Sequence, residues 1–245
     1  MICFLKRHPL VFGSGVFFLF ILILGAGALA VSHSVIDTGA TEISRVTTVI
    51  LDPGHGGEDG GAVGVNGVLE KDLNLEVALN LAALLEKEGV SVILTRSDDR
   101  LLYGESGNVK GHRKENDLKN RLAFAKEYPE ALFVSIHMNT FGEPYYSGLQ
   151  VYYAATEGSR ELASLLQANV KKQLQPQNRR AIQRGDGAIY LLKNAVGCAV
   201  LVECGFLSNP EECALLSEKD YRSKLCFSLF CGMMEYINSM TGDAS

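Results

Sequence analysis

The hydrophobic residues of this chain fall into two kinds of block. Short apolar runs predict strands at 47–51, 90–95, 132–137, 148–153 and 199–203. Longer stretches repeat leucine, valine or alanine at helical spacing and predict helices at 69–89, 118–126, 159–174 and 219–240. The order strand, helix, strand over 47–95 is a βαβ unit, which predicts a parallel sheet.

The run at 199–203, AVLVE, is continuously apolar up to its last residue, as expected for a strand that is buried on both faces. We therefore predict an α/β fold with a single domain over 46–240. Its twisted, mostly parallel sheet is expected to have helices on both faces. Polar loops are predicted at 53–68, 97–117 and 175–188, and the sequence contains no internal repeat.

The first 31 residues form a different kind of segment. Lys6 and Arg7 precede an apolar stretch at 10–31, whose 22 residues contain no charge. As a helix this stretch is about 33 Å long, which is enough to cross a bilayer. We predict a signal or membrane anchor over 1–31 and a polar linker over 32–45, with the domain exported. The small residues of Ala28-Leu29-Ala30 leave cleavage of the segment open.

Charge and cysteine content narrow the function classes. Without Lys6 and Arg7, the exported part has 21 Lys and Arg against 28 Asp and Glu, a net charge near −7. An acidic domain is a poor nucleic-acid binder, since phosphate contacts supply most of that affinity. The five exported cysteines include no CxxC pair, so the sequence does not demand a disulfide and leaves their pairing open. They are Cys198, Cys204, Cys213, Cys226 and Cys231.

Four polar residues at the ends of these blocks form a pattern typical of a metal site. His55 follows the first strand in LDPGHGG, and His137 ends the strand of VSIHMN. Glu70 begins the first helix, and Glu203 closes the run AVLVE. Ligand sites of open α/β sheets lie outside the carboxyl ends of the strands, so we expect these side chains to meet there. Two histidines and a carboxylate form many catalytic zinc sites, and a second carboxylate serves as base.

Each of the four residues also has a plain structural explanation when it is taken alone. His55 fits a turn, and Glu70 fits the first turn of a helix, where the helix dipole favours a carboxylate. His137 fits a hydrogen-bonded core histidine, and Glu203 fits a carboxylate in a structural ion pair. One shared site accounts for all four at once, and we favour it for that reason.

Other signals complete the picture of the candidate site. Asp52, Asn139 and Arg121 are predicted to orient the histidines or to contact substrate. The chain has no Gly-Lys-Ser/Thr phosphate loop, no Gly-x-Ser-x-Gly elbow and no His-Glu-x-x-His helix. These absences argue against nucleotide binding, serine hydrolase chemistry and a zincin-type peptidase.

Taken together, the motifs resemble those of the zinc-dependent N-acetylmuramoyl-L-alanine amidases of bacterial cell walls, the amidase 3 type. The resemblance covers about residues 46–240 and rests on LDPGHGG, GVLEKDLNLEVA, VSIHMN and LVECGFLSN. It implies that His55, Glu70 and His137 hold one Zn²⁺ per chain and that Glu203 is the catalytic acid and base. The chain departs from the family at Gly197-Cys198, where similar sequences commonly carry proline.

An N-terminal anchor followed by one bare catalytic domain is similar to the spore cortex amidases of endospore formers, the CwlD type. The resemblance implies hydrolysis of the amide between N-acetylmuramic acid and L-alanine in peptidoglycan, with a role in making muramic lactam for germination. It implies an extracytoplasmic protein, anchored or secreted, and leaves open an activator protein. The alternatives are a stem-peptide peptidase, a vegetative wall-remodelling amidase and a non-enzymatic wall-binding protein.

Overall fold

The computed structural model of the chain describes residues 47–102, 112–185 and 187–242. These residues build a six-stranded sheet with the strand order β2-β1-β3-β6-β4-β5. The strands are β1 (Thr48–Pro53), β2 (Ser91–Leu94), β3 (Leu132–Asn139), β4 (Gln150–Tyr153), β5 (Gln183–Arg184) and β6 (Ala199–Phe206). β2, β1, β3 and β6 run parallel, whereas β4 is antiparallel to β6 and pairs with β5 at the far edge. The predicted α/β fold with a mostly parallel sheet is confirmed.

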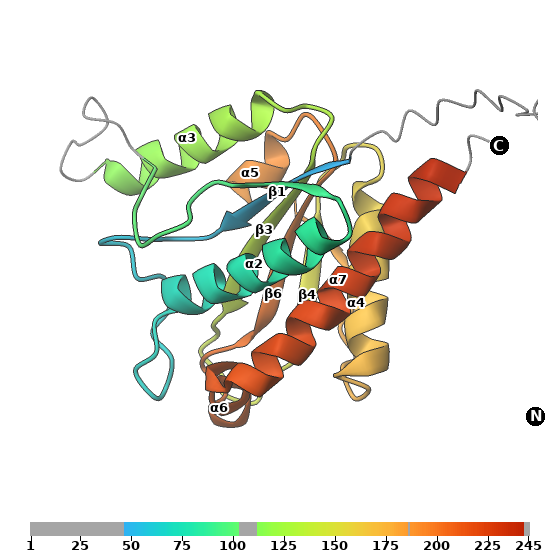
Figure 1. The fold of residues 1–245 in the computed structure, drawn as a ribbon. Helices are drawn as coiled ribbons and strands as arrows, with labels where there is room; N and C mark the ends of the chain where they lie inside the picture. Colours follow the sequence, from blue (N-terminus) through green and yellow to red (C-terminus); the bar gives the residue numbers. More distant parts are fainter. Residues whose placement is uncertain (1–46, 103–111, 186, 243–245) are drawn as a thin grey trace, which may run out of the picture. The chain divides into compact units, whose positions relative to one another are not determined.

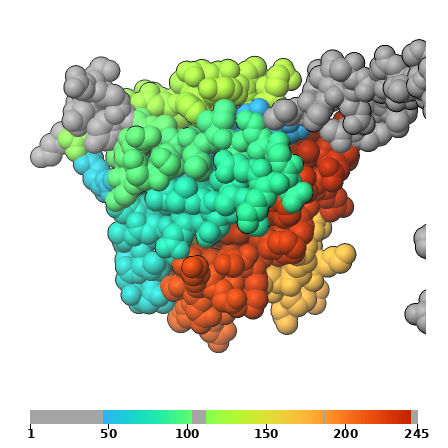
Figure 2. All heavy atoms as spheres, viewed as in Figure 1, coloured from blue at the N-terminus to red at the C-terminus, as the bar shows by residue number. Residues whose placement is uncertain are grey.

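Helices cover both faces of this sheet (Figure 1). The helices α2 (Glu70–Lys87), α4 (Ser159–Gln173) and α7 (Lys219–Gly242) pack on one face. The helices α3 (Arg113–Lys126) and α5 (Tyr190–Lys193) pack on the other, and α6 (Pro210–Ser217) leads into α7. Figure 2 shows α2 and α7 side by side on the visible surface, where the two helices contact each other.

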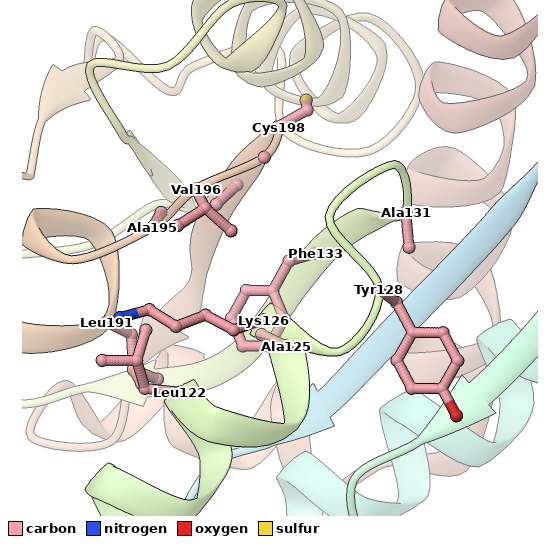
Figure 3. Close-up of a pocket in the computed structure, with 12 residues that line it drawn as sticks. Leu122, Ala125, Lys126, Tyr128, Ala131, Phe133, Leu191, Ala195, Val196 and Cys198 are labelled. Carbon is pink, nitrogen blue, oxygen red and sulfur yellow. The ribbon is translucent and has the colours of Figure 1, made fainter.

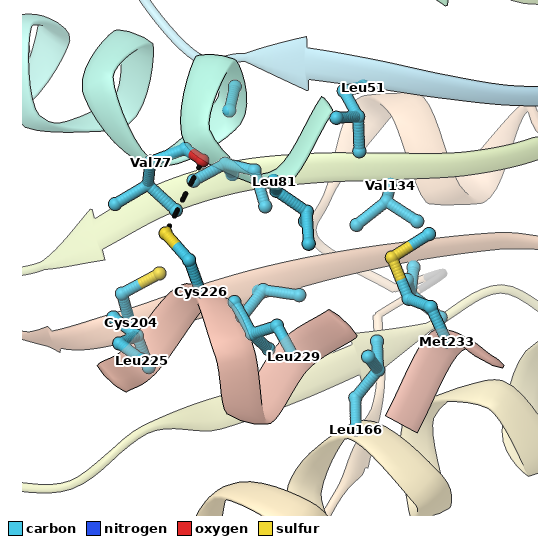
Figure 4. Close-up of a cluster of buried hydrophobic side chains, with 14 of the residues drawn as sticks. Leu51, Val77, Leu81, Val134, Leu166, Cys204, Leu225, Cys226, Leu229 and Met233 are labelled. Atoms are coloured by element: carbon cyan, nitrogen blue, oxygen red, sulfur yellow. Dashed lines mark hydrogen bonds between the residues drawn. The ribbon is translucent and has the colours of Figure 1, made fainter. Parts of the chain in front are cut away.

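The larger hydrophobic core lies between the sheet and α2, α4 and α7 (Figure 4). Along β6, Val200 and Val202 point into this core, while Leu201 points to the smaller core under α3 and α5. Both faces of the strand are therefore buried, which explains its continuous apolar run. Within the larger core, the thiol of Cys226 donates to the Val77 carbonyl oxygen at 3.6 Å.

Several elements differ from the sequence predictions at their ends. α3 begins at Arg113, five residues before the predicted start, and β3 and β6 continue beyond the predicted ends to Asn139 and Phe206. The short elements β5 and α5 and the eight-residue α6 were not predicted. Each of these is too short, or too polar at its start, to produce a repeating hydrophobic pattern.

The predicted anchor at 1–31 and linker at 32–45 lie outside the described residues and stay predictions. Within the described part of the chain, no helix is both long and apolar enough to cross a bilayer. The five cysteines from Cys198 to Cys231 are free thiols, and three of them are buried.

Candidate metal centre

His55 lies in the loop that follows β1. Gly54 donates its backbone N–H to the Ile136 carbonyl oxygen at 2.9 Å, which keeps the chain beside β3 one residue past the strand. His55 then has a φ of 61°, in the left-handed region that few non-glycine residues adopt. Arg121 donates through Nη2 to the His55 carbonyl oxygen at 2.7 Å and thereby holds the turn in place. Such strain persists only where the surroundings enforce it, as at a functional site.

Glu70 is the first residue of α2, and its carboxylate is buried at the edge of the sheet. The backbone N–H of Ala62 donates to Oε2 at 2.8 Å. The backbone N–H of Met138 and the side chain of Asn74 donate to Oε1 at 3.2 and 3.3 Å. These donors come from the loop, from β3 and from α2, so they fix the position of the carboxylate from three directions.

The two histidines and Glu70 meet at one point. Nε2 of His55 lies 3.2 Å from Oε1 of Glu70, and Nδ1 of His137 lies 2.9 Å from the same oxygen. One ligand atom from each residue lies within 4.8 Å of the other two. Segments separated by up to 82 positions in the printed sequence, from His55 to His137, thus converge as predicted. Two imidazoles and a carboxylate in this arrangement can hold a divalent cation.

The charges around His55 favour a positive charge at this point. Asp59 Oδ2 accepts a hydrogen bond from Nδ1 of His55 at 2.9 Å. Burial alone would lower the pKa of His55, but hydrogen bonds and charges from Asp59 and Glu70 outweigh it and raise the pKa to about 9. Burial would raise the pKa of Glu70, yet His137 and His55 hold it below its usual range. A place that stabilises a cationic imidazole is equally suited to a metal cation.

Glu203 stands beside His137, because the two residues are partners in register between β3 and β6. Its Oε2 is buried and has no hydrogen-bond partner among the described residues. Burial raises the pKa of Glu203 to about 7, His137 and His55 oppose the shift, and Glu70 adds to it. A carboxyl group that titrates near neutrality and keeps one oxygen free is suited to accept and return a proton.

Arg121 ties the loop of His55 to the sheet. Its Nη1 donates to Asp52 at 2.5 Å and its Nε donates to Asp117 at 2.7 Å, and all three side chains are buried. Asp52 also accepts hydrogen bonds from two hydroxyl groups on neighbouring segments. Burial alone would raise the pKa of Asp52, but Arg121 and the hydroxyl groups hold it below its usual range. Asp52 therefore supports His55 indirectly: it binds Arg121, which donates to the His55 carbonyl oxygen, and it forms no hydrogen bond with the His55 ring.

Two glycines leave the space that the cluster occupies. A Cβ at Gly54 would lie 2.2 Å from Cε1 of His137. At Gly61, where φ is 67°, a Cβ would lie 2.6 Å from Oε2 of Glu70 and 2.8 Å from Cδ2 of His55. No side chain fits at either position without moving a candidate ligand. The absence of side chains at Gly54 and Gly61 therefore leaves the space in which the candidate ligands lie.

Comparison with known proteins agrees with this geometry. The family model of the N-acetylmuramoyl-L-alanine amidases, Amidase_3, matches residues 49–233. The germination-specific N-acetylmuramoyl-L-alanine amidase of Bacillus subtilis is 38% identical over 189 residues, which cover 77% of this chain and 78% of the relative. The chain belongs to this amidase family.

Similarity to solved structures agrees with this family assignment. The CwlD amidase from Clostridioides difficile, solved in complex with the GerS lipoprotein, is 40% identical with a TM-score of 0.75; the match covers 79% of this chain and 99% of that one. An N-acetylmuramoyl-L-alanine amidase from Clostridium difficile 630 is 30% identical with a TM-score of 0.69; the match covers 79% of this chain and 98% of that one. The amidase is thus a hydrolase of peptidoglycan, and its substrate lies outside the cytoplasm.

The remaining site predictions have mixed outcomes. Asn139 ends β3 opposite Phe206, and its side chain forms no hydrogen bond with a described residue, so its role stays a prediction. Asp59 and Asn74, which the sequence analysis did not single out, bind His55 and Glu70 directly. The signal for Asp59 is a carboxylate four residues after the histidine in a glycine-rich loop. Asn74 has the same spacing from Glu70, one helical turn along α2.

A small apolar hollow lies away from the metal cluster, at the opposite edge of the amidase sheet. Figure 3 shows Leu122, Phe133, Leu191 and Val196 around it, between α3, α5 and the starts of β3 and β6. Lys126 supplies the one charged side chain among its lining residues. Among the residues that the structure describes, no acidic residue or histidine lines the hollow, whereas the cluster of His55, Glu70 and His137 lies at the carboxyl edge of the sheet.

Proposed function

We propose that the amidase binds one Zn²⁺ through His55, Glu70 and His137 and uses Glu203 as the acid and base of hydrolysis. The bond cleaved is the amide between the lactyl group of N-acetylmuramic acid and L-alanine. One observation carries this proposal: a buried, unpartnered carboxylate oxygen of Glu203 stands beside a cluster of three ligands that stabilises positive charge.

The donor set fits zinc because two imidazole nitrogens and one carboxylate are the three protein ligands of many catalytic zinc sites. When bound, zinc acts as a Lewis acid towards the lactyl carbonyl and makes a water molecule acidic near pH 7. The carboxylate of Asp59 keeps Nδ1 of His55 protonated, so that Nε2 faces the metal position. The donors to Glu70 hold its carboxylate in place before any ion arrives.

Glu203 then moves the protons. Its Oε2 takes a proton from the attacking water and returns it to the amide nitrogen as the peptide leaves. A pKa near 7 suits both halves of this cycle, since the group must accept a proton and then give it up. Arg121 and Asp52 do not touch these atoms, and they act by holding the loop of His55.

We propose further that the amidase works on spore cortex and makes muramic lactam for germination. The similarity to the germination-specific amidase of Bacillus subtilis supports this role. An activator is part of the proposal, because the related CwlD amidase was solved with the GerS lipoprotein. The predicted segment at 1–31 would deliver the domain outside the cytoplasm as a membrane anchor or a cleaved signal.

The decisive test compares Glu203→Gln with the wild-type chain on purified peptidoglycan. The variant is expected to keep its zinc, measured by metal analysis, and to lose about 10²–10⁴-fold in rate. Glu86→Gln, at an exposed position on α2, is the matched control and is expected to hydrolyse normally. Hydrolysis by zinc-loaded Glu203→Gln within tenfold of the wild-type rate would contradict the assignment.

The products separate the alternatives. Mass spectrometry should find free lactyl groups on muramic acid together with intact stem peptides. Cleavage inside the stem peptide would identify a peptidase instead. Binding without any product would identify a wall-binding protein. Equal digestion of cortex and vegetative peptidoglycan would contradict the cortex role but not the amidase chemistry.

A further inference from the structure

An open cleft lies beside the start of β4, and the chemistry above does not use it. Its volume is about 740 Å³, which is in the size range of sites for small ligands. It is formed by the loop before β4, the loop after α4 and the start of α6. The lining includes Tyr146, Asn178, Arg180 and Tyr221.

The register of the sheet connects this cleft to the catalytic residues. Glu203 on β6 is the Cα partner of His137 on β3 and of Gln150 on β4. The three side chains therefore form a row on one face of the sheet, about 4.8 Å apart from strand to strand. Arg180 donates through Nη1 to Oε1 of Gln150 at 2.7 Å, so its guanidinium lies next to the residue that follows Glu203 in that row.

Arg180 is held without a negative partner. Its Nε donates to the Ser147 carbonyl oxygen at 2.9 Å, and its guanidinium lies over the ring of Phe206 at 4.4 Å and that of Tyr146 at 5.7 Å. In the described part of the chain, no carboxylate forms an ion pair with Arg180. Neutral acceptors and aromatic faces fix the guanidinium, and no carboxylate hydrogen-bonds to it among the described residues.

The other charged groups of the cleft form no ion pair with Arg180, although its charge acts on Glu212 and lowers the pKa of that carboxyl group against the effect of burial. Arg179 and Glu211 are exposed beside it. The carboxylate of Glu212 is turned to the backbone, where it accepts hydrogen bonds from Gly148 at 2.9 Å and from Phe206 at 2.8 Å. Glu212 thus holds the two loops that flank Arg180.

The charges of Arg180 and Glu203 both affect the pKa of Tyr152. Burial raises the pKa of Tyr152, the charge of Glu203 raises it further, and the charge of Arg180 opposes the rise. Tyr152 also reaches Oε1 of Gln150 through its hydroxyl group, at 3.4 Å. The charges of Arg180 and Glu203 therefore both lie near enough to Tyr152 to shift its pKa.

We propose that Arg180 binds a carboxylate of the leaving stem peptide, on the residue that follows L-alanine. This inference rests on the proposed amidase function and specifies the chemical class of its substrate: an acidic peptide with a free carboxylate at the second position. Arg180 is then a specificity-determining residue, because it contacts the substrate away from the bond that is cleaved.

The direction of the peptide follows from the proton transfer. Glu203 returns its proton to the amide nitrogen, so that nitrogen lies on the Glu203 side of the ligand cluster. On the side of β1, buried Arg121 holds the loop of His55, and we therefore place the peptide on the side of β6 and β4, beside Arg180. Two extended residues span about 7 Å, which brings a carboxylate on the second residue to the far side of Gln150.

The test uses the full-length chain loaded with zinc and two soluble muropeptides. Both carry N-acetylmuramoyl-L-alanyl-γ-D-glutamyl-L-lysine, with the α-carboxylate of the second residue either free or amidated. The wild-type chain is expected to prefer the free carboxylate about 10-fold to 100-fold in kcat/KM, the range of a charge-assisted hydrogen bond. Arg180→Gln is expected to reduce this preference to about twofold, and Arg180→Lys to restore part of it.

Arg179→Gln is the matched control, because it removes the neighbouring exposed arginine from the same cleft and is expected to keep the wild-type preference. Binding of the free product peptides, measured by calorimetry, should show the same order among the variants. If Arg180 has only a structural role, Arg180→Gln should lower kcat/KM equally for the two substrates and leave the preference for the free carboxylate intact. That result overturns the inference. Equal hydrolysis of the two substrates by the wild-type chain also overturns it, whereas hydrolysis of neither refutes the amidase function on which it rests.

Discussion

The two sides of the metal cluster differ in how their charges are neutralised. On the side of β1, Arg121 is enclosed between Asp52 and Asp117, and all three side chains are buried. On the side of β6 and β4, Glu203 keeps a buried oxygen without a partner. Arg180, on the same side, is held by neutral acceptors and aromatic rings.

This difference distinguishes charged groups that fix the geometry of the site from charged groups that can bind substrate. A buried charge with a partner inside the protein is costly to disturb, because removing either partner leaves the other uncompensated. Such groups fix geometry and are poorly suited to bind a ligand. A charge that lacks an internal partner beside an open cleft remains available to substrate. We therefore propose that the β1 side holds the three candidate metal ligands in place and that the β6–β4 side contacts the peptide.

The largest expected effect concerns the β1 side, which we call the paired side because Arg121 forms ion pairs there with Asp52 and Asp117. Arg121→Gln leaves the buried carboxylates of Asp52 and Asp117 without their cation, which should cost about 3–5 kcal/mol of unfolding free energy. Urea unfolding of the wild-type and variant chains measures this difference directly. Arg180→Gln removes an arginine with no carboxylate partner and should cost about 1 kcal/mol or less. Equal losses in the two variants would remove the distinction between the two sides.

A second prediction concerns the support of His55. Asp59→Asn removes the carboxylate that holds Nδ1 of His55, and its partner Lys114 also loses an ion pair. Partners of this kind typically contribute about 10-fold to 100-fold in metal affinity. Zinc affinity, measured by competition with a chelator, should fall by that factor while the fold is kept.

Asp98→Asn is the control for this measurement. Asp98 is exposed, and its carboxylate pairs only with exposed Arg100 among the described ion pairs. Zinc affinity should not change in this variant. If Asp59→Asn also bound zinc as tightly as the wild-type chain, the paired side would not support the metal in the way we describe.

The sequence predicted the parts of the site that mark the ends of apolar runs. His55 follows a tight turn, Glu203 follows four apolar residues, and His137 ends a strand whose apolar run is interrupted only by Ser135. Strand polarity then brings the three residues to one edge of the sheet. Glu70 was found from the start of a helix. Local pattern and the rules of parallel sheets were sufficient for this much of the fold and the site.

The local sequence pattern could not predict which charged side chains form ion pairs with one another. Arg121 lies 69 positions from Asp52 and 66 from His55, and its contacts depend on how α3 packs over the sheet. The start of α3 was missed for a related reason: its first turns, RKEND, are polar throughout and give no periodicity. Contacts from distant segments, such as the hydrogen bond from Leu102 to Asp117, stabilise this end of the helix.

The smallest expected effect is the acid dependence that Asp52 contributes. Its pKa is lowered on folding, so its stabilisation is complete above the unfolded value of about 3.9 and is lost as the pH falls through the lower folded value. Between about pH 5 and pH 2, the unfolding free energy of the metal-free wild-type chain should therefore fall more steeply than that of Asp52→Asn, by about 1 kcal/mol or more over the window. Asp98→Asn should keep the wild-type slope, because its carboxylate is exposed. Parallel slopes for wild type and Asp52→Asn would mean that Arg121 does not hold Asp52 ionised, and the paired side would then owe its rigidity to packing alone.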